Sequence, residues 1–404
     1  MNIILFDDPI IRPSLLPFTF TRPVAGIRLG ILTLTEKWQA YTGSEVSFLT
    51  QDYLSAKFRS VSGGGKQVYV NGAVCPTEVL VQELRSLPLG QALYQGETLI
   101  AYNSDSFTGS NLQDFFNHTT GIRDKQEVSS EITVIRELWD IFRNNGQEIR
   151  NDFSLLTKGR QSQPVADPHT IVYSPENIFL EEGVKIRAAI LNAENGPIYL
   201  GKNSQIHEGA IIKGPFALGE ESFVNVGGKM RGDITIGPFC KVGGEVSNSI
   251  IFGYSNKGHE GFLGNSVIGE WCNLGADSNN SNLKNNYADI KVWNYAAGAY
   301  KNSGLQFCGL MMGDHTKCGI NTMFNTATVV EVSANIFGAG FPPSFIPDFA
   351  WGGAGGLETY RLDKAQEVAA KTMERRGIDL DQIEKDILTH VFEETRKHRD
   401  SMSE

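Results

Sequence analysis

The stretch from Asn256 to Tyr287 contains the side chains whose types and spacing best suit chemistry. It reads NKGHEGFLGNSVIGEWCNLGADSNNSNLKNNY, with one histidine, His259, ahead of regular apolar steps and a run of asparagines. An imidazole takes up a proton near neutral pH, so His259 is a candidate general base. Asparagine amides and backbone N–H groups can donate to a developing oxyanion. The alternative for His259 is a corner histidine bonded to a carbonyl.

The asparagines after this histidine have two interpretations. Asn tolerates the left-handed conformation that tight corners need, and we assign most of them to turns. Asn282 is kept as a candidate ligand contact. The turn residues are Asn279, Asn280, Asn285 and Asn286.

A repeat of six residues must position this stretch. Apolar residues recur at Leu200, Ile206, Ile212, Leu218, Val224, Met230, Ile236 and Val242, then at Ile250, Asn256, Phe262, Ile268 and Leu274, and again at Met312, Cys318, Phe324, Val330 and Ile336. Neither a helix nor a flat strand has a period of six. Short parallel strands around a three-sided coil do, with Gly or Asn at the corners. The pattern predicts a left-handed parallel β-helix of hexapeptide repeats over 170–345, with about six turns.

The repeat is interrupted over 248–262 and over 280–311. Each interruption predicts a loop pushed out from the prism, and loops on rigid scaffolds commonly carry binding residues. The flat faces and open ends of such a coil favour association around a three-fold axis. We therefore expect a homotrimer, with site residues drawn from neighbouring subunits.

Three lysines lie at or between the interruptions and suit a phosphate-bearing substrate. They are Lys241, Lys257 and Lys284. Lys241 and Lys257 suit a phosphate contact best, because they bracket His259 by one coil turn. His207 and His315 are predicted to face solvent. A three-histidine zinc site is not expected, because the chain has no close histidine pair.

Residues 1–160 predict a different kind of domain. NIILF, KQVYVNG and GETLIAY have the pattern of strands, whereas LGILTLTEKWQAY and PTEVLVQELRSL have that of helices, the second with Thr77 as N-cap. Alternating strands and helices predict an α/β domain with a mostly parallel sheet. Residues 346–404 predict a Pro- and aromatic-rich strap followed by a helical tail of two amphipathic helices that separate at Gly377.

The composition limits the class of protein. With 404 residues, 41% of them hydrophobic and 20% charged, the chain has the balance of a soluble globular protein of two or three domains. It has no apolar run long enough for a membrane span, and MNIILFDDPIIRP reads as a buried strand, which predicts a cytoplasmic protein. Five cysteines without a CxxC suit reduced thiols. A formal charge of −10 argues against nucleic acid as partner.

The stretch KGHEGFLGNSVIGEWCNLGADSNNSN resembles the acetyl-acceptor site of the GlmU family, most closely its alternative bacterial branch. The resemblance implies that His259 is the catalytic histidine and that Asn273 and Asn282 are the two family asparagines. It implies N-acetylation of glucosamine-1-phosphate with acetyl-CoA as cosubstrate. Phe262 and Leu283 stand where the family has tyrosines, and GADS replaces Gly-Ala-Gly-Thr.

The N-terminal part is similar to sugar-nucleotide pyrophosphorylases in SLLPFTFTRPV and VYVNGAV. This resemblance implies a nucleotide site and Mg²⁺, although Val24 stands at the family's lysine position and Ala73 at the position of its metal-binding Asp. The candidate nucleotide-binding residues are Arg12, Arg22, Arg28, Lys37 and Asn71. The candidate metal ligands are Asp7, Asp8 and Asp105.

The sequence therefore predicts a transferase of sugar-nucleotide biosynthesis. In the main hypothesis the β-helix acetylates glucosamine-1-phosphate and the N-terminal domain transfers a uridylyl group from UTP to N-acetylglucosamine-1-phosphate. In a second hypothesis the N-terminal domain only binds a nucleotide sugar, as a sensor or assembly module. In a third the chain is a sugar-nucleotide pyrophosphorylase and its β-helix is purely structural.

Overall fold

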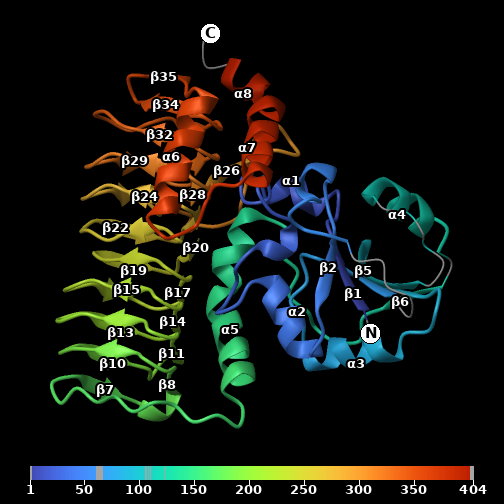
Figure 1. The fold of residues 1–404 in the computed structure, drawn as a ribbon, viewed down its shortest axis with the longest axis horizontal. Helices are drawn as coiled ribbons and strands as arrows, with labels where there is room; N and C mark the ends of the chain where they lie inside the picture. Colours follow the sequence, from blue (N-terminus) through green and yellow to red (C-terminus); the bar gives the residue numbers. More distant parts are fainter. Residues whose placement is uncertain are drawn as a thin grey trace. The chain divides into compact units, whose positions relative to one another are not determined.

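The computed structural model describes residues 2–60, 67–104, 107, 109, 111–122 and 124–400. The chain forms two compact units (Figure 1). The first comprises Met1–Leu15, Thr19–Ile27 and Leu32–Glu137, and the second comprises Leu16–Phe18, Arg28–Ile31 and Leu138–Glu404. The division at 137/138 precedes the expected boundary near 160, because a 20-residue helix, α5 (Leu138–Thr157), belongs to the second unit.

The first unit contains a six-stranded sheet in the order β2-β1-β3-β5-β4-β6. Its strands are β1 (Asn2–Phe6), β2 (Val46–Leu49), β3 (Gln67–Asn71), β4 (Ala92–Gln95), β5 (Thr98–Ser104) and β6 (Lys125–Glu127). β1 pairs in parallel with β2 and β3, whereas β5 runs antiparallel to β3 and β4. The predicted α/β domain is confirmed, and its sheet is mixed.

Short helices flank this sheet and begin where local chemistry allows. They are α1 (Ile11–Ser14), η1 (Val24–Gly26), α2 (Leu34–Thr42), η2 (Asp52–Leu54), α3 (Glu78–Ser86) and α4 (Leu112–Thr119). Thr33 and Glu36 form a reciprocal capping box at the start of α2. The predicted N-cap of α3 is confirmed, since the Thr77 side chain accepts a hydrogen bond from the backbone N–H of Leu80.

The second unit contains the predicted left-handed parallel β-helix (Figure 1). One face is a nine-stranded sheet from β8 (Ile178–Leu180) to β33 (Phe345–Ile346), so the coil has about nine turns rather than about six. A second face runs β9-β12-β15-β18-β21-β24-β29-β32-β34 and ends on β35. We call this second face the groove face.

The strands of the groove face are short, and their bounds matter for the site. They are β9 (Lys185–Ile186), β12 (Gln205–Ile206), β15 (Phe223–Val224), β18 (Lys241–Val242), β21 (Asn256–Lys257), β24 (Asn273–Leu274), β29 (Lys317–Cys318), β32 (Asn335–Ile336), β34 (Ala350–Gly353) and β35 (Gly356–Thr359).

The first interruption of the repeat is not a protruding loop. The coil is shortened there: the inward residues Met230, Ile236 and Val242 pair in register with Val246, Ile251 and Lys257. The predicted second run, which began at Ile250, is thus one residue out of register over its first three members. Inward positions are occupied by Ile251, Lys257 and Leu263, and the side chain of Phe262 faces outward.

The second interruption is a true insertion. Its chain leaves the coil after β25 (Asn279–Asn280), forms an antiparallel pair β26 (Lys291–Asn294) and β27 (Ala299–Asn302), and returns at β28 (Met311–Met312). The expected strap contributes to the coil itself, because β33 and β34 add parallel strands to two of the faces. The helical tail is confirmed as α6 (Leu362–Glu374), α7 (Gln382–Glu394) and α8 (Arg396–Asp400).

One corner of the coil carries a stack of aromatic rings. Phe239, Tyr254, Trp271 and His315 all adopt positive φ, between 52° and 61°. Successive rings of this corner lie nearly parallel, with centroids 5.1, 4.3 and 6.3 Å apart. The left-handed conformation costs roughly 1–2 kcal/mol for a non-glycine residue. Offset stacking of aromatic rings stabilises the fold by a similar free energy, so it offsets this cost. His315 is only 8% exposed, so the expectation that it faces solvent was wrong.

Candidate active site

A row of outward side chains crosses the groove face from strand to strand. The parallel register aligns Phe223, Lys241, Asn256, Asn273 and Lys317, which come from β15, β18, β21, β24 and β29. We call these five residues the outer ladder. Neighbouring strands lie about 4.8 Å apart, so the outer ladder spans four steps, or roughly 19 Å.

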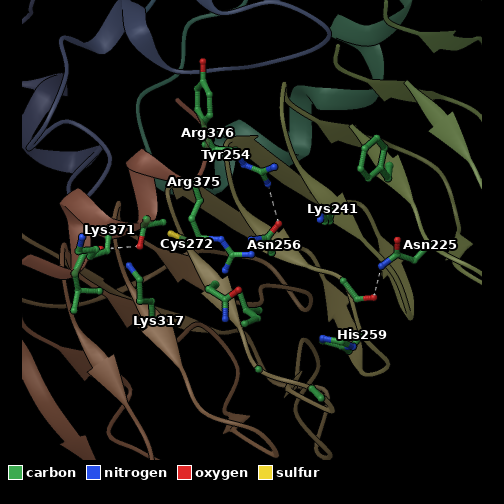
Figure 2. A pocket seen from close by; sticks show the side chains of 18 of the residues that line it. Asn225, Lys241, Tyr254, Asn256, His259, Cys272, Lys317, Lys371, Arg375 and Arg376 are labelled. Carbon is green, nitrogen blue, oxygen red and sulfur yellow. Dashed lines mark hydrogen bonds between the residues drawn. The ribbon is translucent and has the colours of Figure 1, made fainter. Parts of the chain in front are cut away.

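A groove of about 1090 Å³ lies over the outer ladder, and α6 supplies its other wall (Figure 2). Besides the ladder, the lining residues include Asn225, Gly258, His259, Gly275 and Ala276 from the coil, Glu367, Val368 and Lys371 from α6, and Arg375 and Arg376 from the turn that follows α6. All of them belong to the second unit. We call this space the α6 groove. A volume at the upper end of the usual range suits an extended ligand.

His259 reaches the α6 groove from the turn that follows β21. Its side chain is exposed, and it lines the groove together with Lys241 and Asn225 (Figure 2). The amide Nδ2 of Asn225 donates to the carbonyl of Gly258 at 2.8 Å. Gly261 closes the turn with φ of +116°, where a side chain would collide with the backbone of Ser278. His259 thus lies at an exposed turn of the coil, and its imidazole lines the groove.

The far part of the groove is cationic. Lys317 donates from Nζ to the carbonyl of His315 at 2.8 Å, and burial lowers the pKa of its ammonium group to about 8. Lys371 of α6 lines the groove with it, as do Arg375 and Arg376 from the turn that follows α6. Such a concentration of positive charge in an acidic protein favours an anionic ligand.

Only some of the predicted coil residues meet in the groove. Lys241 and Asn273 line it together with His259. Lys257 does not, because its side chain lies inside the coil and is 2% exposed. Asn282 donates to the Oδ1 of Asn265 at 2.8 Å, outside the groove lining.

The third predicted lysine belongs to the insertion. Lys284 is partly exposed and donates from Nζ to the carbonyl of Asp289. It is not among the residues that line the α6 groove. His207, which was expected to face solvent, lines the groove and stacks on Phe223 with ring centroids 5.9 Å apart.

The residues that sequence reasoning missed come from the outer ladder, from α6 and from the turn that follows α6. Lys317 precedes the inward Cys318 as Lys241 precedes the inward Val242, so the predicted register already gave Lys317 the same outward position as Lys241. The groove residues of α6 and of the turn that follows it lie about a hundred positions after His259 in the chain, and nothing in a single sequence links them to it. These residues are Lys371, Arg375 and Arg376.

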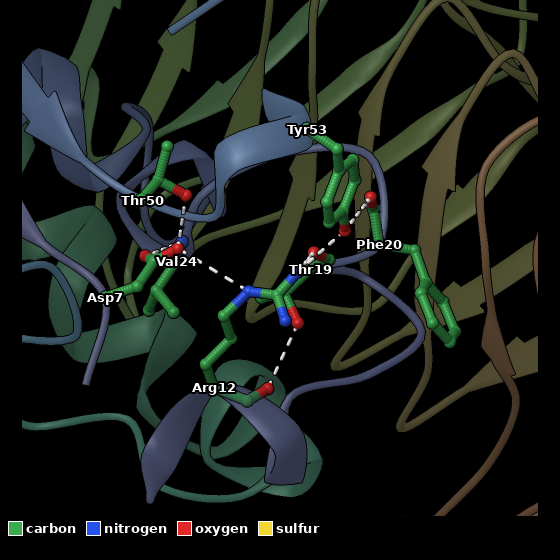
Figure 3. A network of polar contacts seen from close by, with 7 residues as sticks. All are labelled: Asp7, Arg12, Thr19, Phe20, Val24, Thr50 and Tyr53. Carbon is green, nitrogen blue, oxygen red and sulfur yellow. Dashed lines mark hydrogen bonds and ion pairs between the residues drawn. The ribbon is translucent and has the colours of Figure 1, made fainter. Parts of the chain in front are cut away.

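The first unit places several predicted nucleotide and metal residues at the carboxyl ends of β1 and β3. Asp7 accepts hydrogen bonds from the Val24 N–H at 2.8 Å and from the Thr50 hydroxyl at 2.6 Å (Figure 3). Arg12 approaches Asp7 at 3.5 Å and donates to the Thr19 carbonyl and the Tyr53 hydroxyl. Burial raises the pKa of Asp7 despite the nearby arginine.

Two further residues join this edge of the sheet. The Nδ2 of Asn71 donates to the Oδ2 of Asp8 at 3.2 Å, and its Oδ1 accepts from the N–H of Ala73. Asp8 also accepts from the N–H groups of Ile10 and Ile11, which begins the α1 turn. The carboxyl ends of parallel strands are where α/β sheets bind ligands.

The other predicted residues of the N-terminal part are dispersed. Arg22 and Lys37 are buried, Lys37 completely. Arg28 belongs to the second unit, where its Nε donates to the carbonyl of Phe252 at 3.0 Å. Asp105 lies outside the described residues. Among the described residues no group of three or more His, Cys, Asp or Glu side chains is arranged to hold a metal ion.

The comparisons with known proteins concern both halves of the chain. Residues 3–161 match a family model described as sugar nucleotidyl transferase. No curated protein matches the chain. Among solved structures, the polySia-specific acetyltransferase NeuO is 13% identical, with a TM-score of 0.27 and coverage of 51% of this chain and 97% of that protein.

Two further solved structures are UDP-N-acetylglucosamine acyltransferases. The enzyme from Campylobacter jejuni is 12% identical, with a TM-score of 0.24 and coverage of 56% of this chain and 95% of that one. The Arabidopsis enzyme is 11% identical, with a TM-score of 0.23 and coverage of 60% and 93%. Each likeness is distant. The family match confirms the predicted transferase class for the N-terminal part. Among the described residues no helix is both long and apolar enough to cross a bilayer.

Proposed function

We propose that the second unit is an acetyltransferase that uses acetyl-CoA to acetylate the amino group of an amino-sugar phosphate, glucosamine-1-phosphate. The observation that carries the proposal is the α6 groove, which lies along the roughly 19 Å of the outer ladder and is lined by both the exposed His259 and a cationic wall. An extended thioester cosubstrate with several phosphates fits that combination of length and charge. The resemblance of the KGHEGFLGNS stretch to the GlmU acceptor site supports the acceptor.

The groove residues then have defined roles. The amine of the acceptor attacks the thioester carbonyl while His259 takes its proton, so that an N–C bond forms as the C–S bond breaks. Asn273 is the candidate donor to the oxyanion that develops on the carbonyl. The imidazolium returns its proton to the departing thiolate. Lys241 lines the groove on the outer ladder, one strand before Asn256, and is the candidate contact for the phosphate of the acceptor.

The cationic wall would hold the phosphates of the cosubstrate. Lys317 would contact them from the coil, Lys371 from α6, and Arg375 and Arg376 from the turn that follows α6. The predicted homotrimer and a bound Mg²⁺ in the N-terminal unit stay predictions.

Proton uptake on binding is one expected consequence. Burial holds the pKa of Lys317 at about 8, whereas a bound phosphate would raise it. At pH 8 we expect CoA binding to take up about half a proton, and affinity to fall as pH rises through 8. Calorimetry in buffers of different ionisation enthalpy measures this uptake. Lys317→Met should abolish it, although Lys257 also has a pKa near 8, since Lys257 does not face the groove. Uptake that persists in this variant would contradict the assignment.

For the first unit a specific observation favours binding of a nucleotide sugar without rapid nucleotidyl transfer. The Asp7 carboxyl is already occupied by Val24, Thr50 and Arg12, which leaves little capacity for Mg²⁺. Val24 and Ala73 also stand where the resembled enzymes have a lysine and an aspartate. This agrees with the second hypothesis above, and the match to sugar nucleotidyl transferases supports the nucleotide ligand.

We therefore expect UDP-N-acetylglucosamine to raise the melting temperature while pyrophosphate release from UTP and N-acetylglucosamine-1-phosphate stays at background. The measurement is a coupled pyrophosphate assay with and without Mg²⁺, beside a thermal-shift titration. Mg²⁺-dependent release that Asp7→Asn removes would show that the unit is a nucleotidyltransferase and would restore the main hypothesis.

A further inference from the structure

The inward column of the groove face contains one exception to its apolar pattern. In the described coils its members are Ile186, Ile206, Val224, Val242, Lys257, Leu274, Cys318 and Ile336, followed by Gly352, which has no side chain. All eight side chains are buried. Seven of them are apolar or, in the case of Cys318, carry a thiol. The exception, Lys257, is 2% exposed and comes two residues before His259.

The Lys257 side chain turns its ammonium toward the turn that carries His259. Its Nζ donates to the carbonyl of His259 at 2.8 Å and to those of Gly243 and Glu260 at 3.3 Å. Three acceptors match the three protons of an ammonium group. Burial lowers the pKa of this ammonium to about 8. The cost of burial is thus offset by contacts with the turn rather than by contact with a ligand.

The turn from 257 to 261 has a donor for every one of its carbonyls. Backbone N–H groups of Gly243, Asp277 and Glu245 donate to the carbonyls of residues 257, 260 and 261, respectively. Asn225 donates to the carbonyl of residue 258. The carbonyl of His259 itself has Lys257 as the donor that the structure gives it. The backbone of the candidate base is therefore held from inside the coil.

We propose that Lys257 is a positioning residue, whose buried ammonium fixes the turn that aims His259 into the α6 groove. The proposal rests on the proposed acetyl transfer and deepens it, because it explains why this coil departs from the apolar column. It also revises the prediction that Lys257 contacts a phosphate of the substrate. A reacting group must be held close to its productive position, and a shift of about 1 Å can cost up to 100-fold in rate.

Replacing Lys257 with an apolar residue should therefore stabilise the coil but leave the imidazole of His259 less firmly positioned. Replacing Lys257 with leucine restores the apolar column found at Val242 and Leu274 and removes a buried charge. It also leaves the carbonyl of His259 without its donor. Functional residues often lower stability in this manner, and apolar replacements at such positions are commonly stabilising.

The test compares Lys257→Leu with the wild-type chain and with Ile251→Val, a control that removes one methyl group from the core of the same coil. For Lys257→Leu we expect kcat for acetyl transfer to fall about tenfold, with KM values within twofold and a melting temperature equal to or above that of the wild type. For Ile251→Val we expect a lower melting temperature and an unchanged kcat. An unchanged kcat in a folded Lys257→Leu variant would overturn the proposal.

Amide hydrogen exchange provides a readout that does not depend on catalysis. The N–H groups of Gly243, Glu245 and Asp277 donate to the turn, so they should exchange faster in Lys257→Leu and not in Ile251→Val. If the wild-type chain has no acetyltransferase activity, the proposed function fails, and exchange alone decides the role of Lys257. Unchanged exchange at these three amides would overturn the positioning role.

A second variant covers the case in which leucine does not fold. Lys257→Met is unbranched and of similar length, and it removes the same donor. The same loss of kcat, with the same pattern of exchange, is expected. If neither variant folds, Lys257 is a folding residue and the proposal is wrong.

Discussion

Replacing His259 with alanine should lower the rate of CoA release with glucosamine-1-phosphate by at least about 100-fold. The side chain is exposed to the α6 groove from a turn that has a donor for each carbonyl, so the substitution removes the imidazole without disturbing a core. General-base catalysis contributes about 10²–10⁴ in rate, which sets the expected loss. The melting temperature should stay within a degree or two of the wild type. A thiol-reactive dye that detects free CoA measures the rate.

The matched control is His169→Ala, which changes an exposed histidine at the start of the β-helix outside the groove. It should leave CoA release unchanged. A His259→Ala variant that keeps full activity would show that the base lies elsewhere, and the acetyltransferase proposal would then lack its central residue. No CoA release from the wild-type chain would reject the proposal and favour a purely structural β-helix.

Reversing the charge of Arg375 and Arg376 together should raise the KM for acetyl-CoA by about 100-fold, with a smaller effect on kcat. Both side chains line the α6 groove, and the NH2 group of Arg376 lies 3.4 Å from the Oδ1 of Asn256 on the outer ladder. Hydrogen bonds between charged groups are worth about 1.5–3 kcal/mol each, and about 1.4 kcal/mol is a factor of ten. Steady-state kinetics over a range of acetyl-CoA concentrations give the two constants separately.

The control for this double variant changes the net charge equally but outside the groove. Arg361→Glu with Arg396→Glu alters two exposed residues of the tail and should leave the KM unchanged. A second control uses S-acetyl-N-acetylcysteamine, a thioester that carries no phosphate. Its slow turnover should be equal in the wild type and in the Arg375/Arg376 variant. If the variant loses activity equally with both thioesters, Arg375 and Arg376 shape the groove and do not bind phosphate.

The sequence predicts the framework well because a period of six leaves few alternatives. The apolar positions from Leu200 to Val242 are all buried, as expected for the inward residues of a coil. The prediction fails where a coil is shortened, since the next run of residues still looks periodic when it is displaced by one. Because the predicted register was displaced by one, it placed Lys257 on the outside of the coil, where a lysine would suit a ligand contact.

The site could be predicted in part for a related reason. His259 and Asn273 are close in sequence, and both meet in the groove. The cationic wall depends on the tertiary packing of α6, whose amphipathic pattern is the same whether its polar face meets solvent or a ligand. Asn282 and Lys284 follow the coil in sequence, but the insertion that begins there carries them out of the groove lining.

The location of α6 after the coils in chain order has a consequence for how the protein is made. Each coil contacts its neighbours, so the spiral can extend turn by turn as the polypeptide leaves the ribosome. A nascent chain that has reached Ile336 contains His259 and nearly every coil, yet it lacks the helix that supplies the second wall. The binding cleft is therefore completed only after the coils have been synthesised, and products that stop before Leu362 would carry the scaffold without the pocket.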